Sequence, residues 1–212
     1  EADVPQVSLN HFFVVVDEAT FEAIQNSEYL RESFAVTETR VTRRSDASYS
    51  GFYVYGETTY FEILTRSSNL WESAIILSGD QEGDLERVRN SQLPQLIINP
   101  SPITREYRGV QIPWFTTAGN LPYPAYSKLG LGLMEYHPSY LTQYYPDPMQ
   151  QTTTVSREDV LARYASVLGI KHSDRLLKDV VGITASVARA DRFELSRFFE
   201  TLGFETAEAA DG

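Results

Sequence analysis

The chain has 212 residues, no cysteine, 29 acidic against 18 basic residues and a formal net charge of −11. This charge argues against a nucleic-acid surface, which needs clustered Lys and Arg to displace phosphate counterions, and against docking on an anionic membrane. The absence of cysteine excludes disulfides, thiolate zinc sites and cysteine nucleophiles. No apolar run approaches the roughly 20 residues that span a bilayer, so we expect no membrane insertion.

The chain begins at Glu1 with a polar lead of six residues. Such a lead is either the mature end left by signal-peptide cleavage or the start of a shortened chain, and both alternatives stay open. We therefore expect a soluble protein of unknown compartment, with export and removal of a signal peptide as one alternative.

The first seventy residues predict one helix among four strands. We expect, in order, strand 7–16, helix 18–26, edge strand 37–44, and a hairpin of strands 48–55 and 58–64. Asp17 is placed to cap the helix, and Gly56 with Glu57 forms a tight turn between two aromatic strands. The element order is β-α-β-β-β.

The next seventy residues predict the same order a second time. We expect strand 73–78, helix 84–91, strand-like segments 97–98 and 108–116, and strand 129–137. This is a duplication by element order rather than a sequence repeat.

The last third predicts a crossover loop followed by helices. We expect loop 138–153, a helix ending near residue 168, strand 179–187 and an amphipathic helix 191–202. Ser156 and Asp159 match a capping box, and Gly203 fits a left-handed helix end.

Tandem β-α-β-β-β units with His in the first strand and Glu in the last resemble the vicinal-oxygen-chelate superfamily, which includes glyoxalase I, fosfomycin-resistance proteins and extradiol dioxygenases. The segments that carry the resemblance are Leu9-Asn10-His11-Phe12, Ser50-Gly51-Phe52-Tyr53, Thr59-Tyr60-Phe61-Glu62 and Leu202-Gly203-Phe204. More closely, Ser50–Gly56, Ile112–Phe115 and Met134–Pro138 look like an uncharacterised family of glyoxalase-like domains.

The resemblance implies an α+β fold in which tandem βαβββ units form cupped, mixed sheets, or half-barrels, with helices on the outside. It divides the chain into a first unit, 1–72, a second unit, 73–140, and a remainder, 141–212, packed on the same core. Half-barrels of this superfamily often pair between chains, so the resemblance also implies a homodimer.

The resemblance places His11 and Glu62 at metal-ligand positions of the first unit and Glu135 at the comparable position of the second. The second unit has no histidine in its first strand. His137 could fill that gap, because residues two apart on a strand point to the same side. An imidazole with carboxylates suits a divalent ion such as Mn²⁺, Fe²⁺, Zn²⁺ or Ni²⁺. The alternative is that His11 is a hydrogen-bonded core residue and Glu62 pairs with an arginine.

Other side chains could complete a cavity in this sheet. Tyr60 shares the parity of Glu62 and could donate from its phenol, and Trp114 is either a cavity wall or, as we favour, core. The arginines at 40, 43 and 44 either steer an anionic substrate or, as we favour, lie on a solvated edge.

Two functions follow from these residues. One is a metal-dependent lyase, isomerase or oxygenase acting on a small oxygen-rich substrate, with Tyr60, Glu62 and Glu135 as catalytic residues. The alternative is a non-catalytic module that binds a small ligand or a protein partner.

Overall fold

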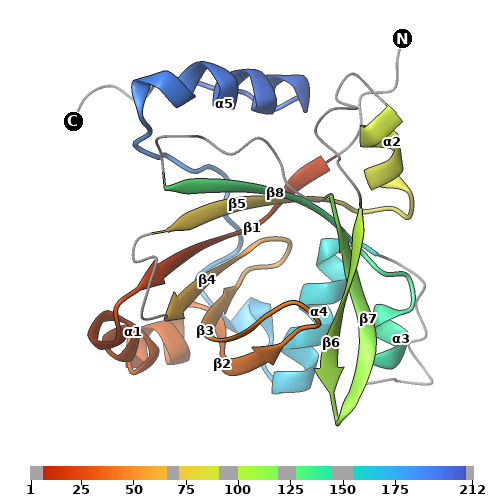
Figure 1. The fold of residues 1–212 in the computed structure, drawn as a ribbon. Coiled ribbons are helices and arrows are strands. Elements are labelled where there is room, and N and C mark those ends of the chain that lie inside the picture. The colour runs from red at the N-terminus through yellow and green to blue at the C-terminus, as the bar shows by residue number, and fades with distance from the viewer. Residues whose placement is uncertain (1–6, 66–71, 91–99, 119–127, 145–154, 209–212) are drawn as a thin grey trace.

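The computed structural model describes residues 7–65, 72–90, 100–118, 128–144 and 155–208. A single eight-stranded mixed sheet organises these residues and curls into a half-barrel, so the expected α+β class is confirmed (Figure 1). The strands are β1 (Val7–Val16), β2 (Val36–Arg43), β3 (Ser48–Tyr55), β4 (Tyr60–Thr65), β5 (Ser73–Gly79), β6 (Ser101–Tyr107), β7 (Val110–Thr117) and β8 (Leu129–Tyr136).

The strands lie in the order β2-β3-β4-β1-β5-β8-β7-β6. The pairs β1–β4 and β5–β8 are parallel, and β1 and β5 join the two halves of the sheet as an antiparallel pair. The two edge strands curl towards each other, because Arg44 bridges to Arg105 and the backbone N–H of Ser45 donates to the carbonyl of Thr104 at 3.0 Å. The concave side of the sheet is therefore partly closed off.

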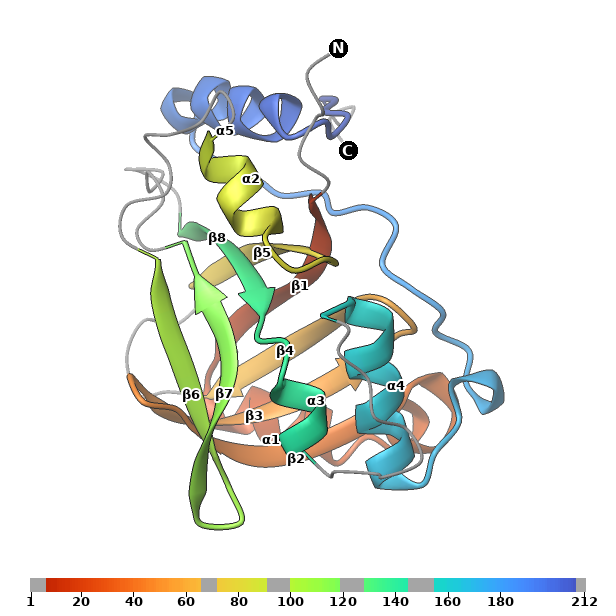
Figure 2. The same cartoon turned by 90° about the vertical axis from the view of Figure 1, so that its right-hand side faces the viewer.

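Helices cover the two faces of the sheet differently (Figure 2). The helical elements are α1 (Glu18–Gln25), a π-helical turn η1 (Tyr29–Phe34), α2 (Asp84–Asn90), α3 (Tyr140–Gln143), α4 (Arg157–Leu168), a 3-10 turn η2 (His172–Asp174) and α5 (Arg189–Thr201). Elements α1, α2 and α5 pack on the convex face, whereas α3 and α4 fill part of the concave face. None of the described helices is both long and apolar enough to cross a membrane.

Successive side chains along a strand point in turn to the concave and to the convex face of the sheet. On β8, Leu129 and Leu133 join the apolar cluster under α5, and Met134 and Tyr136 join the cluster under α3 and α4. Residues of one parity on a strand share a face, so the even-numbered residues of β8 point into the cup.

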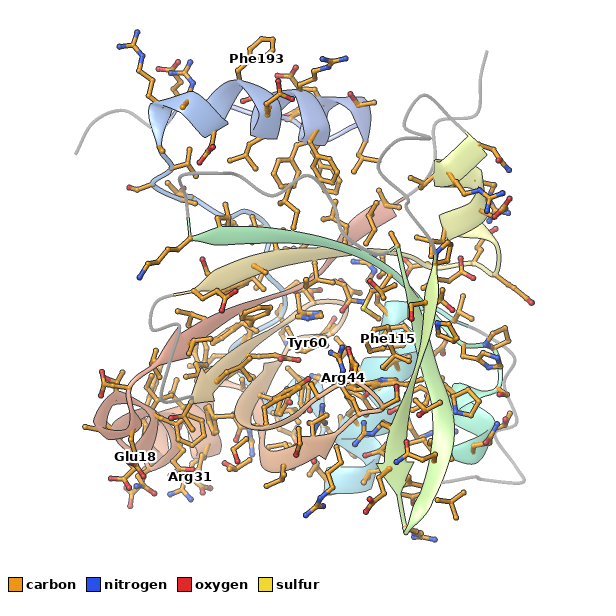
Figure 3. All side chains as sticks on the ribbon, viewed as in Figure 1. Glu18, Arg31, Arg44, Tyr60, Phe115 and Phe193 are labelled. Atoms are coloured by element: carbon orange, nitrogen blue, oxygen red, sulfur yellow. The ribbon has the colours of Figure 1, made fainter. Side chains whose placement is uncertain are left out.

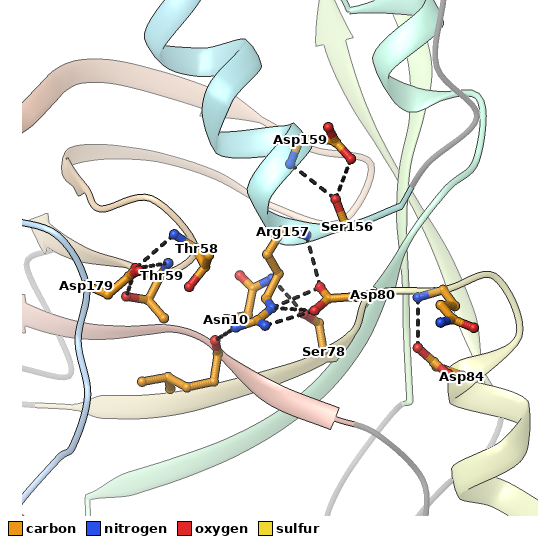
Figure 4. A network of polar contacts seen from close by, with 12 residues as sticks. Asn10, Thr58, Thr59, Ser78, Asp80, Asp84, Ser156, Arg157, Asp159 and Asp179 are labelled. Carbon is orange, nitrogen blue, oxygen red and sulfur yellow. Dashed lines mark hydrogen bonds and ion pairs between the residues drawn. The ribbon is translucent and has the colours of Figure 1, made fainter. Parts of the chain in front are cut away.

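Polar contacts fix α4 inside the cup (Figure 4). The predicted cap is confirmed, since the Ser156 hydroxyl accepts from the backbone N–H of Asp159 at 3.2 Å. The Arg157 guanidinium donates to both carboxylate oxygens of Asp80, directly after β5, and to the carbonyl of Leu9 in β1. These contacts bind the start of the helix to the centre of the sheet.

The predicted strand over 179–187 is wrong. That segment carries no regular structure and is held at its start, where one carboxylate oxygen of Asp179 accepts from the N–H groups of Thr58 and Thr59 at 2.8 Å. Its β-branched composition is compatible with extended backbone, but it pairs with no strand of the described sheet. The predicted strand-like segment 97–98 lies outside the described residues.

Candidate functional site

The concave face contains a cavity of about 360 Å³ between the first half of the sheet and the β7–β8 pair. Its wall is largely apolar and aromatic, with a few polar groups among them. Figure 3 shows Tyr60, Arg44 and Phe115, which line it, near the middle of the fold. The volume is at the lower end of the range for small-molecule sites.

His11 lies in the wall of this cavity and is buried. Its ring stacks on that of Tyr60 with the centroids 4.5 Å apart, because the two residues are register partners on the parallel strands β1 and β4. Burial, with a smaller contribution from the charge of Arg44, lowers the pKa of His11 from 6.5 to about 3. The imidazole is therefore neutral at physiological pH.

The Asn10 side chain sets the tautomer of this neutral ring. Its amide nitrogen donates to the Ser78 hydroxyl at 2.8 Å, which leaves the amide oxygen to face Nδ1 of His11 at 2.8 Å. An oxygen acceptor at that position requires a proton on Nδ1, so Nε2 carries a lone pair. His11 thus offers a hydrogen-bond acceptor to whatever lies in the cavity.

Glu62 is a buried carboxyl group that lines the same cavity. Its register partner on β1 is Phe13, two residues beyond His11. Strand rise and spacing then place the Cα atoms of His11 and Glu62 roughly 8 Å apart on one face. The structure therefore brings together the imidazole and the carboxyl group that the sequence singles out.

Tyr60 belongs to a chain of buried phenols. The side chains of Tyr60 and Asn10 both hydrogen-bond to the phenol of Tyr136. Burial, followed by the neighbouring Tyr136 and Glu62, raises the pKa of Tyr60 well above its ordinary value. Its phenol therefore keeps its proton at neutral pH and acts as a hydrogen-bond donor rather than as an acid.

The basic residues of β2 are not a uniformly solvated edge. The side chain of Arg40 is only 9% exposed, donates to Glu38 at 2.7 Å and to the Tyr55 phenol at 2.9 Å, and lies 3.8 Å above the centre of the Tyr53 ring. Arg43 is exposed, as expected. Arg44 lines the cavity, and its Nε and Nη2 atoms donate to the two carboxylate oxygens of Asp46.

Glu135 and His137 do not reach this cavity. The carboxylate of Glu135 accepts from the backbone N–H groups of Gly83 and Leu85, at 3.0 and 2.8 Å, at the start of α2 on the convex side. His137 is exposed, and its Nδ1 contacts the Ser139 hydroxyl at 2.8 Å. The expectation that these two residues join His11 and Glu62 is wrong, because odd-numbered residues of this segment face away from the cup.

The side chains present do not fit the ligand set that the resemblance implies. Strands β5 and β8 present Ala74, Ile76, Gly130, Gly132 and Met134 to the cavity, and none of these side chains offers the nitrogen or oxygen that a borderline divalent ion prefers. The oxygen-bearing residues of this half that line the cavity are Glu72, Thr117 and Tyr136. No three His, Asp or Glu side chains form a metal-binding group within the described ranges. His11 and Glu62 are the two protein ligands that remain from that set.

Features that sequence reasoning missed shape the cavity further. Gly130 and Gly132 alternate along β8, and both lie in its wall. A Cβ atom at Gly132 would lie 2.6 Å from Cδ1 of Ile76, so the missing side chain makes room for Ile76 to lie flat. Alternating glycines within a strand signal such a close approach.

Trp114 is both core and cavity wall. It is 3% exposed, packs in the concave cluster and lines the cavity. Its indole N–H is buried and has no hydrogen-bond partner among the described residues. A buried donor left without an acceptor costs about 1–3 kcal/mol, so this N–H group is a local cost of packing the indole into the concave cluster.

A family model covers almost the whole of this arrangement. It matches residues 9–212 and is described as a family of unknown function, DUF5829. The chain belongs to DUF5829. No curated protein matches this DUF5829 chain. Among solved structures it is similar to a hypothetical protein from Staphylococcus aureus, with a TM-score of 0.40 and 11% identity over 66% of this chain, and it spans 65% of that protein's length.

Proposed function

We propose that this protein binds a small organic molecule in the concave cavity of its sheet. The observation that carries the proposal is the cavity of about 360 Å³ on the concave face, whose largely apolar and aromatic wall contains the buried imidazole of His11 with its unprotonated Nε2. Small-molecule sites are concave and mostly apolar with a few placed polar groups, so this cavity suits an organic molecule that donates a hydrogen bond to His11.

The architecture supports a shared descent of the two sheet halves. Residues 1–72 and 73–140 would be two βαβββ units, because each half places its first strand parallel to its last and the two first strands pair at the centre. This arrangement supports the resemblance to the vicinal-oxygen-chelate superfamily, in which paired units enclose a ligand cavity. Residues 141–212 would be an addition that narrows this cup with α4.

The test is a fragment screen by saturation-transfer NMR on the unmodified protein and on variants with a filled cavity. Ala74→Phe places a ring in the cavity wall, and Thr117→Phe does so at a half-buried position that tolerates the larger side chain more readily. Ala190→Phe, exposed on α5, is the matched control. Fragments that bind the protein and Ala190→Phe but neither filled variant support the proposal. If every detected fragment binds all four proteins equally, the cavity is not a binding site.

A metal-dependent enzyme is the second candidate, and one observation favours it. His11 presents an unprotonated Nε2 to the cavity that Glu62 lines, and an acceptor that binds the proton of the other ring nitrogen is typical of metal-binding histidines. Titration with Mn²⁺ and Zn²⁺ followed by calorimetry tests it, with His11→Phe as the variant and Glu106→Gln, exposed on β6, as control. Stoichiometric binding lost only in His11→Phe would favour the enzyme, and no binding above the control would reject it.

A further inference from the structure

We infer that residues 181–187 pair with the same residues of a second copy of this chain, as an antiparallel two-stranded ribbon whose two-fold axis passes through Thr184. This pairing is independent of the proposed function, because the segment lies outside the cavity of the concave face. Three observations support it: the exposed backbone of the segment, the order of its side chains and the charges at its two ends.

Residues 181–187 run along the outside of the molecule as the blue segment that leads to α5 (Figure 2). Val181 is fully exposed, and within the described ranges no backbone N–H or carbonyl group of the segment makes a hydrogen bond. Both ends are held in place, because the N–H of Val180 donates to the Thr59 hydroxyl at 2.8 Å and Ala188 is the N-cap of α5. The segment therefore presents open hydrogen-bonding groups, as the edge strand of a sheet does.

Side chains along the segment alternate as they do on a strand. The sequence is Val181-Gly182-Ile183-Thr184-Ala185-Ser186-Val187. Its odd-numbered residues are apolar, and three of them, Ile183, Ala185 and Val187, line a groove against α5. The segment contains neither a charge nor a proline, which are the features that protect exposed strand edges from pairing. Its composition is therefore that of a strand that accepts a partner.

A second copy of the segment is the partner that this sequence fits. When two antiparallel copies are centred on Thr184, Val181 faces Val187 and Ile183 faces Ala185. The apolar side chains of both copies then lie on one face of the ribbon. The two Thr184 side chains face each other at the centre, which is a favourable cross-strand pair.

Opposite charges flank the segment and fit the same register. Asp179 precedes it and Arg189 follows it, so centring on Thr184 directs Asp179 of each copy towards Arg189 of the other. Hydrogen bonds from Thr58 and Thr59 hold Oδ1 of Asp179, whereas Oδ2 makes none in the described part of the chain. A parallel pairing would set like charges together at each end, so these charges favour the antiparallel arrangement.

Sedimentation velocity with charge variants at Thr184 tests the pairing. The unmodified chain should show a monomer–dimer equilibrium in the micromolar range, as expected for a small interface. Thr184→Lys and Thr184→Glu should each weaken dimerisation by about tenfold or more, because each sets two like charges directly opposite each other. An equimolar mixture of the two variants should form a heterodimer, because opposite charges then face each other. Thr39→Lys, exposed on β2, is the matched control and should dimerise as the unmodified chain does.

Disulfide trapping tests the register directly. The chain has no cysteine, so Thr184→Cys introduces a single thiol into each copy. Facing residues of an antiparallel pair lie within the distance that a disulfide spans. On mild oxidation Thr184→Cys should form a covalent dimer about tenfold faster than Thr39→Cys, because pairing raises the effective concentration of the thiols.

The pairing is supported by a heterodimer in the mixture together with trapping at Thr184. A chain that stays monomeric throughout the micromolar range overturns it and leaves a strand of a different protein as the occupant of the segment. A dimer that both charge variants retain forms through another surface, such as the paired half-barrels that the resemblance implies, and also overturns the inference. Loss of the dimer in both variants without a heterodimer in the mixture overturns the antiparallel register about Thr184.

Discussion

Replacing Glu135 by alanine should destabilise the fold without affecting the cavity. The carboxylate accepts two backbone N–H groups, from Gly83 at 3.0 Å and from Leu85 at 2.8 Å, at the start of α2. These donors have no partner within a helix, and a carboxylate there also interacts favourably with the helix dipole.

The size of the effect follows from these two contacts. Each hydrogen bond contributes about 1 kcal/mol net, and the partial exposure of Glu135 offsets the extra strength that its charge would give. We therefore expect Glu135→Ala to lower the free energy of unfolding by about 2 kcal/mol, which corresponds to roughly 4–8 °C in Tm for a chain of this size. Glu135→Gln should cost about 1 kcal/mol or more, because it keeps one acceptor but turns an NH₂ group towards the second donor.

Urea denaturation and thermal melting measure this effect, with Glu106→Ala as control. Glu106 is an exposed strand glutamate, so its loss changes the net charge equally but removes no cap. If Glu135→Ala shifts the unfolding midpoint no more than Glu106→Ala, the capping argument is refuted. If Glu135→Ala also weakens a cavity ligand tenfold while the fold is intact, the placement of Glu135 on the convex side is refuted.

Three further effects follow from the structure. Arg157→Met should cost about 1–3 kcal/mol in urea denaturation, and adding Asp80→Asn should cost little more, since the first change already breaks their ion pair. The pKa of His11 is about 3 in the folded protein and 6.5 in the unfolded chain, so between these values the free energy of unfolding rises with pH, and above them this contribution is constant. In a pH series of denaturation curves, the free energy of unfolding of His11→Phe should rise less steeply over this range, by about 1 kcal/mol per pH unit. Gly56→Ala should destabilise by about 2 kcal/mol or more in the same assay, because its Cβ would lie 2.5 Å from the carbonyl oxygen of Lys178.

The elements were largely predictable because local signals and packing agree in most of them. Strand 7–16, the hairpin about Gly56 and the helix capped by Asp17 appear with their ends within about one or two residues of expectation. The prediction of a strand over 179–187 failed because its composition favours an extended backbone, whereas strand pairing also requires a free edge of a sheet. The two edge strands of the sheet, β2 and β6, meet each other at the Arg44–Arg105 bridge instead.

The candidate site was half predictable. His11 and Glu62 lie in one cavity because the alternation of side chains along β1 and β4 points both of them to the concave face. The apolar run of β1 and the hairpin that contains β4 indicate this alternation in the sequence. Arg40 was misplaced, since a charged residue on an edge strand normally faces water, whereas its guanidinium lies over Tyr53 of the neighbouring strand β3 and near Tyr164 of α4. The helix that covers it comes from a part of the chain far from β2, so no local pattern indicates its burial.

Glu135 shows why the second half of the site could not be transferred by analogy. The side-chain period of a strand is two residues, so an alignment wrong by one residue exchanges the two faces of the sheet. On β8 the positions that face the cup are Gly130, Gly132, Met134 and Tyr136, and the glutamate between the last two serves α2 instead. The same alternation that removes a carboxylate from the cavity puts glycine in its wall, and at Gly132 the space that a side chain would take is filled by Cδ1 of Ile76. The wall at β8 is therefore backbone and aliphatic carbon, which suits contact with an organic ligand better than coordination of a metal ion.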